Sequence, residues 1–304
     1  MSSPTFGAAP AASLILASGF WAAGTVISKA MLTSVSPITL LIVQLAPSVI
    51  VLWLIAYASG ARSASTRSLV IIILLGFLNP GLAYTFSMLG LARTTAGVAS
   101  LLWAAEPALV IVMARLVIGE RLHLGLIATV VVAFVGVLLV AGPTGNGEGI
   151  GWGNGLVLMG VSCCALYTVL SRKIVSDISP LFIVATQQSA GLICALCVWP
   201  FFEDGQSRRL LLSLSAAQWV GAVASGLMYY GAAFWFYLIG LRSVPASVAA
   251  AFLNLIPVFT IAASYLVLDE HLSLSQWLGA IVILISVCAL LVWGKRQVAT
   301  LSTG

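Results

Sequence analysis

Apolar stretches of about 20 residues follow one another along the whole chain, and each is long enough to cross a bilayer as a helix. Only 7% of the residues are charged, whereas about a quarter are charged in an average soluble domain. The short alternating segments that are typical of a membrane β-barrel are absent from the sequence. The sequence therefore predicts an all-α integral membrane protein that crosses the bilayer many times.

We predict ten transmembrane helices, joined by connections too short to form separate domains. Serine followed by proline opens the second and the seventh of them, and this pair is typical of a helix start. The predicted ranges are 11–32, 37–58, 67–88, 94–116, 124–141, 152–171, 180–201, 217–240, 246–267 and 274–293.

Lysine and arginine are unevenly divided between the two ends of these helices, and cytoplasmic ends of membrane proteins carry the excess. The sequence thus predicts a multi-pass protein of the bacterial inner membrane with both termini in the cytoplasm. The net charge of +5 reflects this topology and indicates no nucleic-acid partner. Nine of the 13 cations then lie inside, namely Arg62, Arg67, Arg115, Arg121, Arg172, Lys173, Arg242, Lys295 and Arg296.

The chain contains an internal repeat. Residues 25–37 match residues 168–180 at an offset of 143, and further along the offset is 150. Each copy holds five predicted helices, so the second copy must enter the membrane from the opposite side. The sequence therefore predicts two inverted five-helix repeats, 1–145 and 146–304, around a central cavity, which is the architecture of alternating-access transporters. Pairs at the second offset include Gly76/Gly226, Gly81/Gly231, Phe86/Phe236 and Pro107/Pro257.

Two equivalent segments carry a family resemblance. "LARTTAGVASLLWAAEPALVIVMARLVIGERL" (91–122) and "LRSVPASVAAAFLNLIPVFTIAASYLVLDEHL" (241–272) each combine a small-residue helix, a mid-helix proline and an acidic step into the next helix. The chain resembles the EamA-type ten-helix branch of the drug/metabolite transporter superfamily, and within it the bacterial aromatic-amino-acid exporters of the YddG type. The resemblance implies a cavity formed mainly by helices 1–4 and 6–9, peripheral helices 5 and 10, and export of a small metabolite.

Glu106 is the only acidic residue well inside a predicted span, and Ile256 takes its place in the second repeat. An ionisable group at membrane depth is a functional candidate. Glu106 either holds helices together through hydrogen bonds, or couples transport to protons, or contacts a substrate ammonium group. Its depth, roughly 18 Å from the outer helix end against roughly 5 Å for Lys29, argues against an ion pair between them. Hydrogen-bond donors near its level are Trp21, Asn79 and Gln44.

Asn254 is the second polar group in the middle of a span, and the repeat places it opposite Ala104 rather than Glu106. A two-residue step turns a helix by roughly 200°, so Glu106 and Asn254 cannot both face equivalent cavity walls. We slightly favour Asn254 as the cavity residue, because an amide needs no compensating charge.

Aromatic residues are concentrated in "MYYGAAFWFY" (228–237), and ordinary packing and a substrate cavity are both consistent with them. The equivalent residues Gln44 and Gln187 serve either an interhelical hydrogen bond or a substrate contact. The predicted substrate-binding residues are Trp21, Gln44, Asn79, Tyr84, Trp103, Glu106, Gln187, Tyr230 and Asn254, and the predicted hinges are Pro80, Pro107, Pro245 and Pro257.

The sequence predicts a secondary transporter that exports amino acids, including aromatic and other large neutral ones. A multidrug or nucleotide-sugar carrier is the alternative, while a channel or an intramembrane enzyme fits less well because the chain has no catalytic motif. No ATP-binding segment, metal site or cofactor is expected. The expected partners are the bilayer and a small-molecule substrate, with proton coupling left open, in a monomer or weak dimer.

Overall fold

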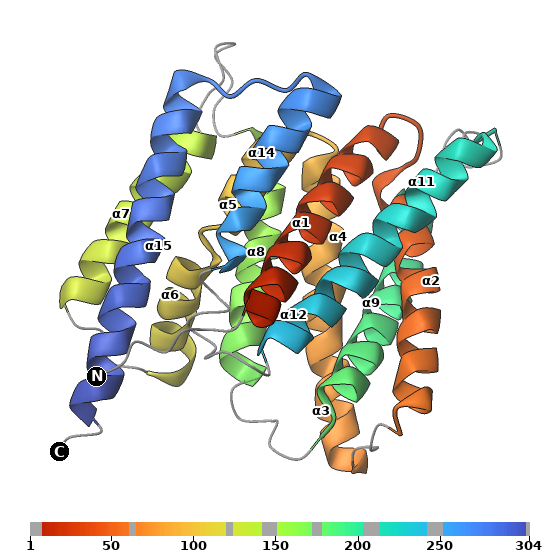
Figure 1. Ribbon diagram of the computed structural model, residues 1–304, viewed down its shortest axis with the longest axis horizontal. Helices are drawn as coiled ribbons and strands as arrows, with labels where there is room; N and C mark the ends of the chain where they lie inside the picture. The colour runs from red at the N-terminus through yellow and green to blue at the C-terminus, as the bar shows by residue number, and fades with distance from the viewer. Residues whose placement is uncertain are drawn as a thin grey trace.

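The structure is a computed structural model that describes residues 8–60, 65–119, 124–141, 151–171, 178–202, 213–241 and 252–301. These residues form a bundle of helices without a β-strand among them (Figure 1). The helices are α1 (Ala8–Met31), α2 (Pro37–Ala58), α3 (Thr66–Gly76), α4 (Ala83–Leu91), α5 (Ala96–Trp103), α6 (Glu106–Ile118), α7 (Leu124–Ala141), α8 (Trp152–Ser171), α9 (Pro180–Phe202), α11 (Ala216–Gly226), α12 (Ala233–Leu241), α14 (Leu255–Leu268) and α15 (Leu274–Leu301), with the π-helical turns η1 (Phe77–Leu82) and η2 (Leu227–Ala232).

Each predicted range contains a helix within the part of the chain that the structure describes, and residues 246–251 lie outside it. Five helical runs among the described residues are long and apolar enough to cross a membrane. The pair α5 and α6 makes a sixth if the two are taken as one bent span. Shorter apolar helices occur at Ile127–Ala141, Leu255–Leu268 and Leu274–Ser286.

The serine–proline pairs start helices as predicted. Ser36 is the N-cap of α2 and Pro37 its first residue, while α9 begins at Pro180. Proline suits this position because its fixed φ is already helical and its missing N–H would have no intrahelical partner there.

Two of the predicted spans are broken at prolines rather than continuous. α3 ends at Gly76, four residues before Pro80, and Asn79 in the following η1 has non-helical φ and ψ of −142° and 115°. α5 ends at Trp103, four residues before Pro107, and α6 continues at an angle of 41°. Both breaks follow from proline, whose ring clashes with the carbonyl four residues earlier. At the equivalent place in the second half, η2 is a π-helical turn without a proline.

Helices from the two halves of the chain pack against each other. α4 packs on α8 and α12 on α1, while α6 contacts α8 and α14 contacts α1. Behind them α2 packs on α9. The pair α7 and α15 runs side by side along one edge of the bundle (Figure 1), which is the peripheral place that the family resemblance implies for helices 5 and 10.

Two equivalent glycines, Gly76 and Gly226, allow close approaches between further pairs of helices. A Cβ atom on Gly76 would lie 2.8 Å from the Cα of Gln187, and one on Gly226 would overlap the backbone of Gln44. Small residues at such positions let helix backbones meet in a membrane, where packing replaces the hydrophobic effect as the cause of helix association. The glycines therefore fix how α3 sits on α9 and how α11 sits on α2.

Candidate functional site

A cavity of about 400 Å³ lies between helices of the two halves, which is within the usual size range of small-molecule sites. Its walls come from α1, η1, α4, α5, α6, α8, η2, α12 and the segment around the start of α14. No residue of α2 or α9 lines it, so the implied contribution of helices 2 and 7 is wrong for this structure. Those two helices instead pack against each other behind the lining helices.

Aromatic rings make up much of the wall. Tyr84 lies at the centre of one group, with ring centroids 6.3 Å from Trp103, 5.9 Å from Tyr229 and 5.1 Å from Tyr230. A second group forms around Trp21, which meets Phe234 and Tyr237 edge to face. Such rings offer a large apolar surface of fixed shape, and their faces attract cations.

Glu106 brings a carboxyl group to this cavity. It is the first residue of α6, directly after the break that separates α5 from α6. Thr168 Oγ1 and Cys164 Sγ, both on α8, donate hydrogen bonds to the Oε1 atom of Glu106 at 3.2 and 3.5 Å. No basic side chain in the described part of the chain forms an ion pair with it. The hydrogen bonds hold the carboxyl group in place but leave its charge without a counter-charge.

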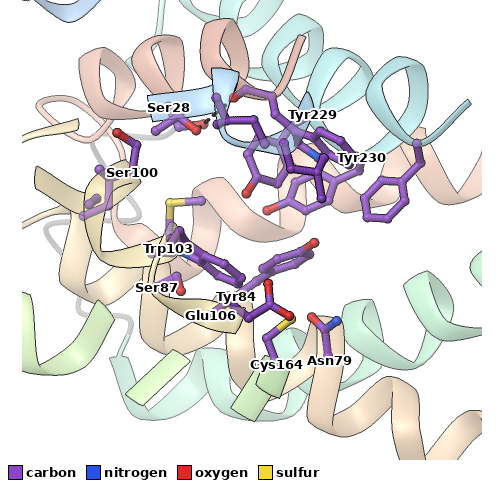
Figure 2. Close-up of a pocket in the computed structure, with 18 of the residues that line it drawn as sticks. Ser28, Asn79, Tyr84, Ser87, Ser100, Trp103, Glu106, Cys164, Tyr229 and Tyr230 are labelled. Carbon is purple, nitrogen blue, oxygen red and sulfur yellow. Dashed lines mark hydrogen bonds between the residues drawn. The ribbon is translucent and has the colours of Figure 1, made fainter. Parts of the chain in front are cut away.

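Further polar groups lie close to Glu106. Figure 2 shows Asn79 and Cys164 beside Glu106 on one side of the cavity, with Tyr229 and Tyr230 on the other side. Asn79 Oδ1 and Ser87 Oγ are buried without a hydrogen-bond partner among the described residues. Buried polar atoms are rarely left unsatisfied in folded proteins. Asn79 and Ser87 both line the cavity, although these two atoms are themselves covered.

Six of the nine predicted substrate-binding residues line the cavity: Trp21, Asn79, Tyr84, Trp103, Glu106 and Tyr230. Gln44 and Gln187 do not. Gln44 Nε2 donates to Ser28 Oγ and Ser225 Oγ, each at 2.7 Å, and Gln187 Oε1 accepts from the Tyr167 hydroxyl at 3.1 Å. Both glutamines therefore act through interhelical hydrogen bonds, one of the two roles left open for them.

The preference for Asn254 over Glu106 as a cavity residue was wrong. Leu253 and Ile256 line the cavity and Asn254 does not, because Asn254 lies in the turn that precedes α14. The donors expected for Glu106 were also wrong, since its hydrogen bonds come from α8. Lys29 is separate from Glu106 as expected, and its Nζ donates to the carbonyl of Leu91 at 2.9 Å.

The predicted hinge prolines lie at or near helix breaks. Pro107 is in the first turn of α6, Pro80 is within η1, and Pro257 is in the first turn of α14. Pro245 lies outside the described residues. Whether the helices move at these positions stays a prediction.

Several residues that line the cavity were not predicted from the sequence, although the internal repeat could have identified them. At an offset of 143, Trp21 and Thr25 correspond to Cys164 and Thr168, and all four line the cavity. The same holds at an offset of 150 for five further pairs. These pairs are Asn79/Tyr229, Tyr84/Phe234, Ser87/Tyr237, Trp103/Leu253 and Glu106/Ile256.

A bundle of apolar helices around a cavity of this size and composition defines a membrane protein that handles a small molecule. Residues 9–142 and 151–292 each match the model of the EamA-like transporter family. The chain belongs to this family, within the drug/metabolite transporter superfamily, and the members of the family are transporters rather than enzymes.

Similar proteins include an uncharacterized transporter of Archaeoglobus fulgidus, 25% identical over 70% of this chain and 74% of its own length. The uncharacterized transporter YvbV of Bacillus subtilis is 29% identical over 73% of this chain and 72% of its own length. A protein of Escherichia coli named "Probable amino-acid metabolite efflux pump" is 28% identical over 62% of this chain and 65% of its own length. One solved crystal structure superposes with a TM-score of 0.61 over 94% of this chain and 98% of its own, at 18% identity, which concerns the fold alone.

Proposed function

We propose that this protein is a secondary transporter that exports small metabolites, above all amino acids with large apolar side chains, by alternating access through the central cavity. One observation carries the proposal: seven pairs of equivalent residues from the two repeats line one and the same cavity of ligand size. A site at the interface of inverted repeats can be opened to either side by rocking one half against the other.

In the proposed architecture ten helices form two inverted repeats, 1–145 and 146–304, in the bacterial inner membrane with both termini in the cytoplasm. The exact correspondence of η1 and η2, 150 residues apart, supports the repeat. The helix contacts support it as well. In the first half α4 and α6 contact α8, and in the second half the equivalent helices α12 and α14 contact α1. We assign the bending to Pro80, Pro107 and Pro257.

The walls support a substrate with an apolar body and an amino group. The aromatic rings around Tyr84 and Trp21 suit a large side chain, and Glu106 offers a carboxylate to an ammonium group. The Escherichia coli relative that is named as an amino-acid metabolite efflux pump supports the same substrate class. A nucleotide-sugar substrate is disfavoured, because no basic side chain of the described residues lines the cavity to meet its phosphates.

Flux measurements with the purified protein in liposomes test the proposal. We expect saturable transport of phenylalanine, tryptophan or leucine, and mutual competition between them. Empty liposomes and liposomes that contain a heat-inactivated sample are the controls. Transport of sugar nucleotides without transport of any amino acid would overturn the proposed substrate class.

Proton coupling is a separate hypothesis, motivated by the carboxyl group of Glu106 in the cavity. Transport is measured with and without a pH gradient, in the wild type and in Glu106→Gln. We expect the gradient to accelerate the wild type and to have no effect on the variant. Equal rates in all four conditions would remove Glu106 from the coupling role.

A further inference from the structure

We propose that the cavity selects ligands whose only charge is an ammonium group, so that an aromatic amine binds more tightly than the amino acid with the same side chain. The inference rests on the proposed transport through this cavity and ranks aromatic amines above the amino acids of the proposed substrate class. It follows from the charge balance of the walls, from the free Oε2 atom of Glu106 and from the placement of the aromatic rings.

The charge balance favours a ligand with a single positive charge. Glu106 is the only formally charged residue among the described residues that line the cavity, and no lysine, arginine or histidine lines it. An ammonium ligand and the Glu106 carboxylate neutralise each other. A zwitterionic amino acid would bring a second carboxylate that meets no cation, and an unpaired buried charge is costly.

Lys29, the lysine that lies next to a lining residue in the sequence, makes its hydrogen bond to another group. Lys29 follows the lining residue Ser28, but its Nζ donates to the carbonyl of Leu91. The hydroxyl groups of Thr25, Ser28 and Ser100 donate to backbone carbonyls of their own helices. These groups therefore have no free proton to offer to a ligand carboxylate.

Glu106 presents an acceptor to a donor ligand. Both hydrogen bonds to the carboxyl group end on Oε1, which leaves Oε2 without a donor among the described residues. The side chain of Asn79 lies beside Glu106 in Figure 2, but its Oδ1 atom is covered and does not itself face the cavity. An ammonium group has three protons and no acceptor, so it complements the Oε2 atom of Glu106.

Aromatic rings complete the site for a cation with an apolar body. Tyr84, Tyr229 and Tyr230 pack together as one cluster that lines the same cavity as Glu106. Ring faces attract ammonium groups, and more strongly where water is excluded. The tyrosine hydroxyls are neutral donors, which can bind a carbonyl oxygen but cannot cancel the charge of a carboxylate.

Three ligands of nearly equal shape test the inference: phenethylamine, phenylalanine and 3-phenylpropionate, which carry the ammonium group alone, both charges, and the carboxylate alone. Binding to the purified full-length protein is measured by titration calorimetry, and transport by counterflow in liposomes. We expect the Kd of phenethylamine to be at least about tenfold lower than that of phenylalanine. Burying the carboxylate of phenylalanine without a cation beside it costs free energy that corresponds to a factor of about this size. Phenylpropionate is expected to bind most weakly.

Two variants test whether the charge of Glu106 causes the preference for the amine. Glu106→Gln keeps the shape of the side chain and removes its charge. The ratio of the Kd of phenylalanine to that of phenethylamine should then fall below about threefold. Glu106→Asp keeps the charge and should preserve the order of the three ligands, provided that size-exclusion profiles match the wild type. Equal or tighter binding of phenylalanine in the wild type overturns the inference and leaves amino-acid transport standing. If the folded wild type binds and transports none of the three, the inference and the proposed substrate class both fall.

Discussion

Residues 77–82 and 227–232 are π-helical turns at equivalent places, 150 residues apart, yet the first is kinked at Asn79 and the second is not, and the first brings Asn79 to the cavity and the second Tyr229. The same contrast continues along the walls. Ser87 and Glu106 of the first half are matched by Tyr237 and Ile256 of the second. The repeat thus preserves the positions of the π-helical turns, while the carboxyl group of Glu106 and the amide of Asn79 belong to the first half. The shape of the cavity and its chemistry can change independently.

The largest expected effect concerns the part that the halves share, the close helix contacts. Gly226→Ala would drive a Cβ into the backbone of Gln44, and Gly76→Ala would do the same at Gln187. Because neither backbone can yield without separating two helices, we expect each change to cost about 3 kcal/mol and to lower the yield of folded protein sharply. The measurement is the melting temperature in detergent and the size-exclusion profile.

Gly231→Ala is the matched control for both glycine changes. Gly231 is also buried and lies five residues beyond Gly226, but a Cβ there would meet nothing within 4 Å. We expect its melting temperature to stay close to that of the wild type. If Gly226→Ala is tolerated as well as Gly231→Ala, the close contact of α11 with α2 is not what holds the halves together.

The second expected effect concerns the part in which the halves differ. Glu106→Gln should lower the transport of an ammonium ligand at least about tenfold, since it removes the charge that pairs with the ligand. Adding Ile256→Glu moves the carboxyl group to the equivalent place in the second half, where Thr25 corresponds to Thr168. We expect this double variant to recover only part of the lost rate, because Tyr229 replaces the amide of Asn79. Full recovery, measured as initial flux in liposomes, would contradict a role for the asymmetric wall.

Hydropathy and the repeat predicted the helical ranges well, because apolar length and proline position act locally along the chain. The breaks at Pro80 and Pro107 follow the same local logic, whereas η2 has no proline and could not be predicted in this way. The cavity residues were harder to predict. Whether Asn254 or Glu106 faces the cavity depends on how the helices are rotated in the assembled bundle: Glu106 and its equivalent Ile256 line the cavity, whereas Asn254 and its equivalent Ala104 do not.

The hydrogen bonds of Glu106 show a second limit of the sequence. Its partners Thr168 and Cys164 lie about 60 residues away in the chain, on a helix of the other half. Composition and expected depth identified residues that line the same cavity as Glu106, such as Trp21 and Asn79. They could not identify which helices pack side by side, which is a property of the assembled bundle.

A smaller effect is expected at the Lys29 end of the bundle, where the second half contacts the first through Glu270. Its carboxylate accepts hydrogen bonds from the backbone N–H groups of Ala96 at 2.8 Å and Gly97 at 3.3 Å, at the start of α5. Negative charge at a helix N-terminus is stabilising, so Glu270→Gln should cost about 1 kcal/mol and lower the melting temperature by a few degrees. The neighbouring Asp269, whose side chain is 95% exposed, provides the control Asp269→Asn, which should leave the melting temperature unchanged. A drop of equal size in both variants would remove Glu270 from this anchoring role.

The smallest effect separates two equivalent threonines. Thr168 Oγ1 donates to Glu106, whereas its counterpart Thr25 donates to the carbonyl of Trp21 in its own helix. Thr168→Val keeps the shape and removes one hydrogen bond to the carboxyl group, which is worth about 1 kcal/mol, so we expect the KM of an ammonium substrate to change by about fivefold. Thr25→Val removes a bond that does not reach Glu106 and should change the KM by less than about twofold. Equal shifts in the two variants would mean that α8 does not position Glu106, and that the halves are chemically more alike than their side chains indicate.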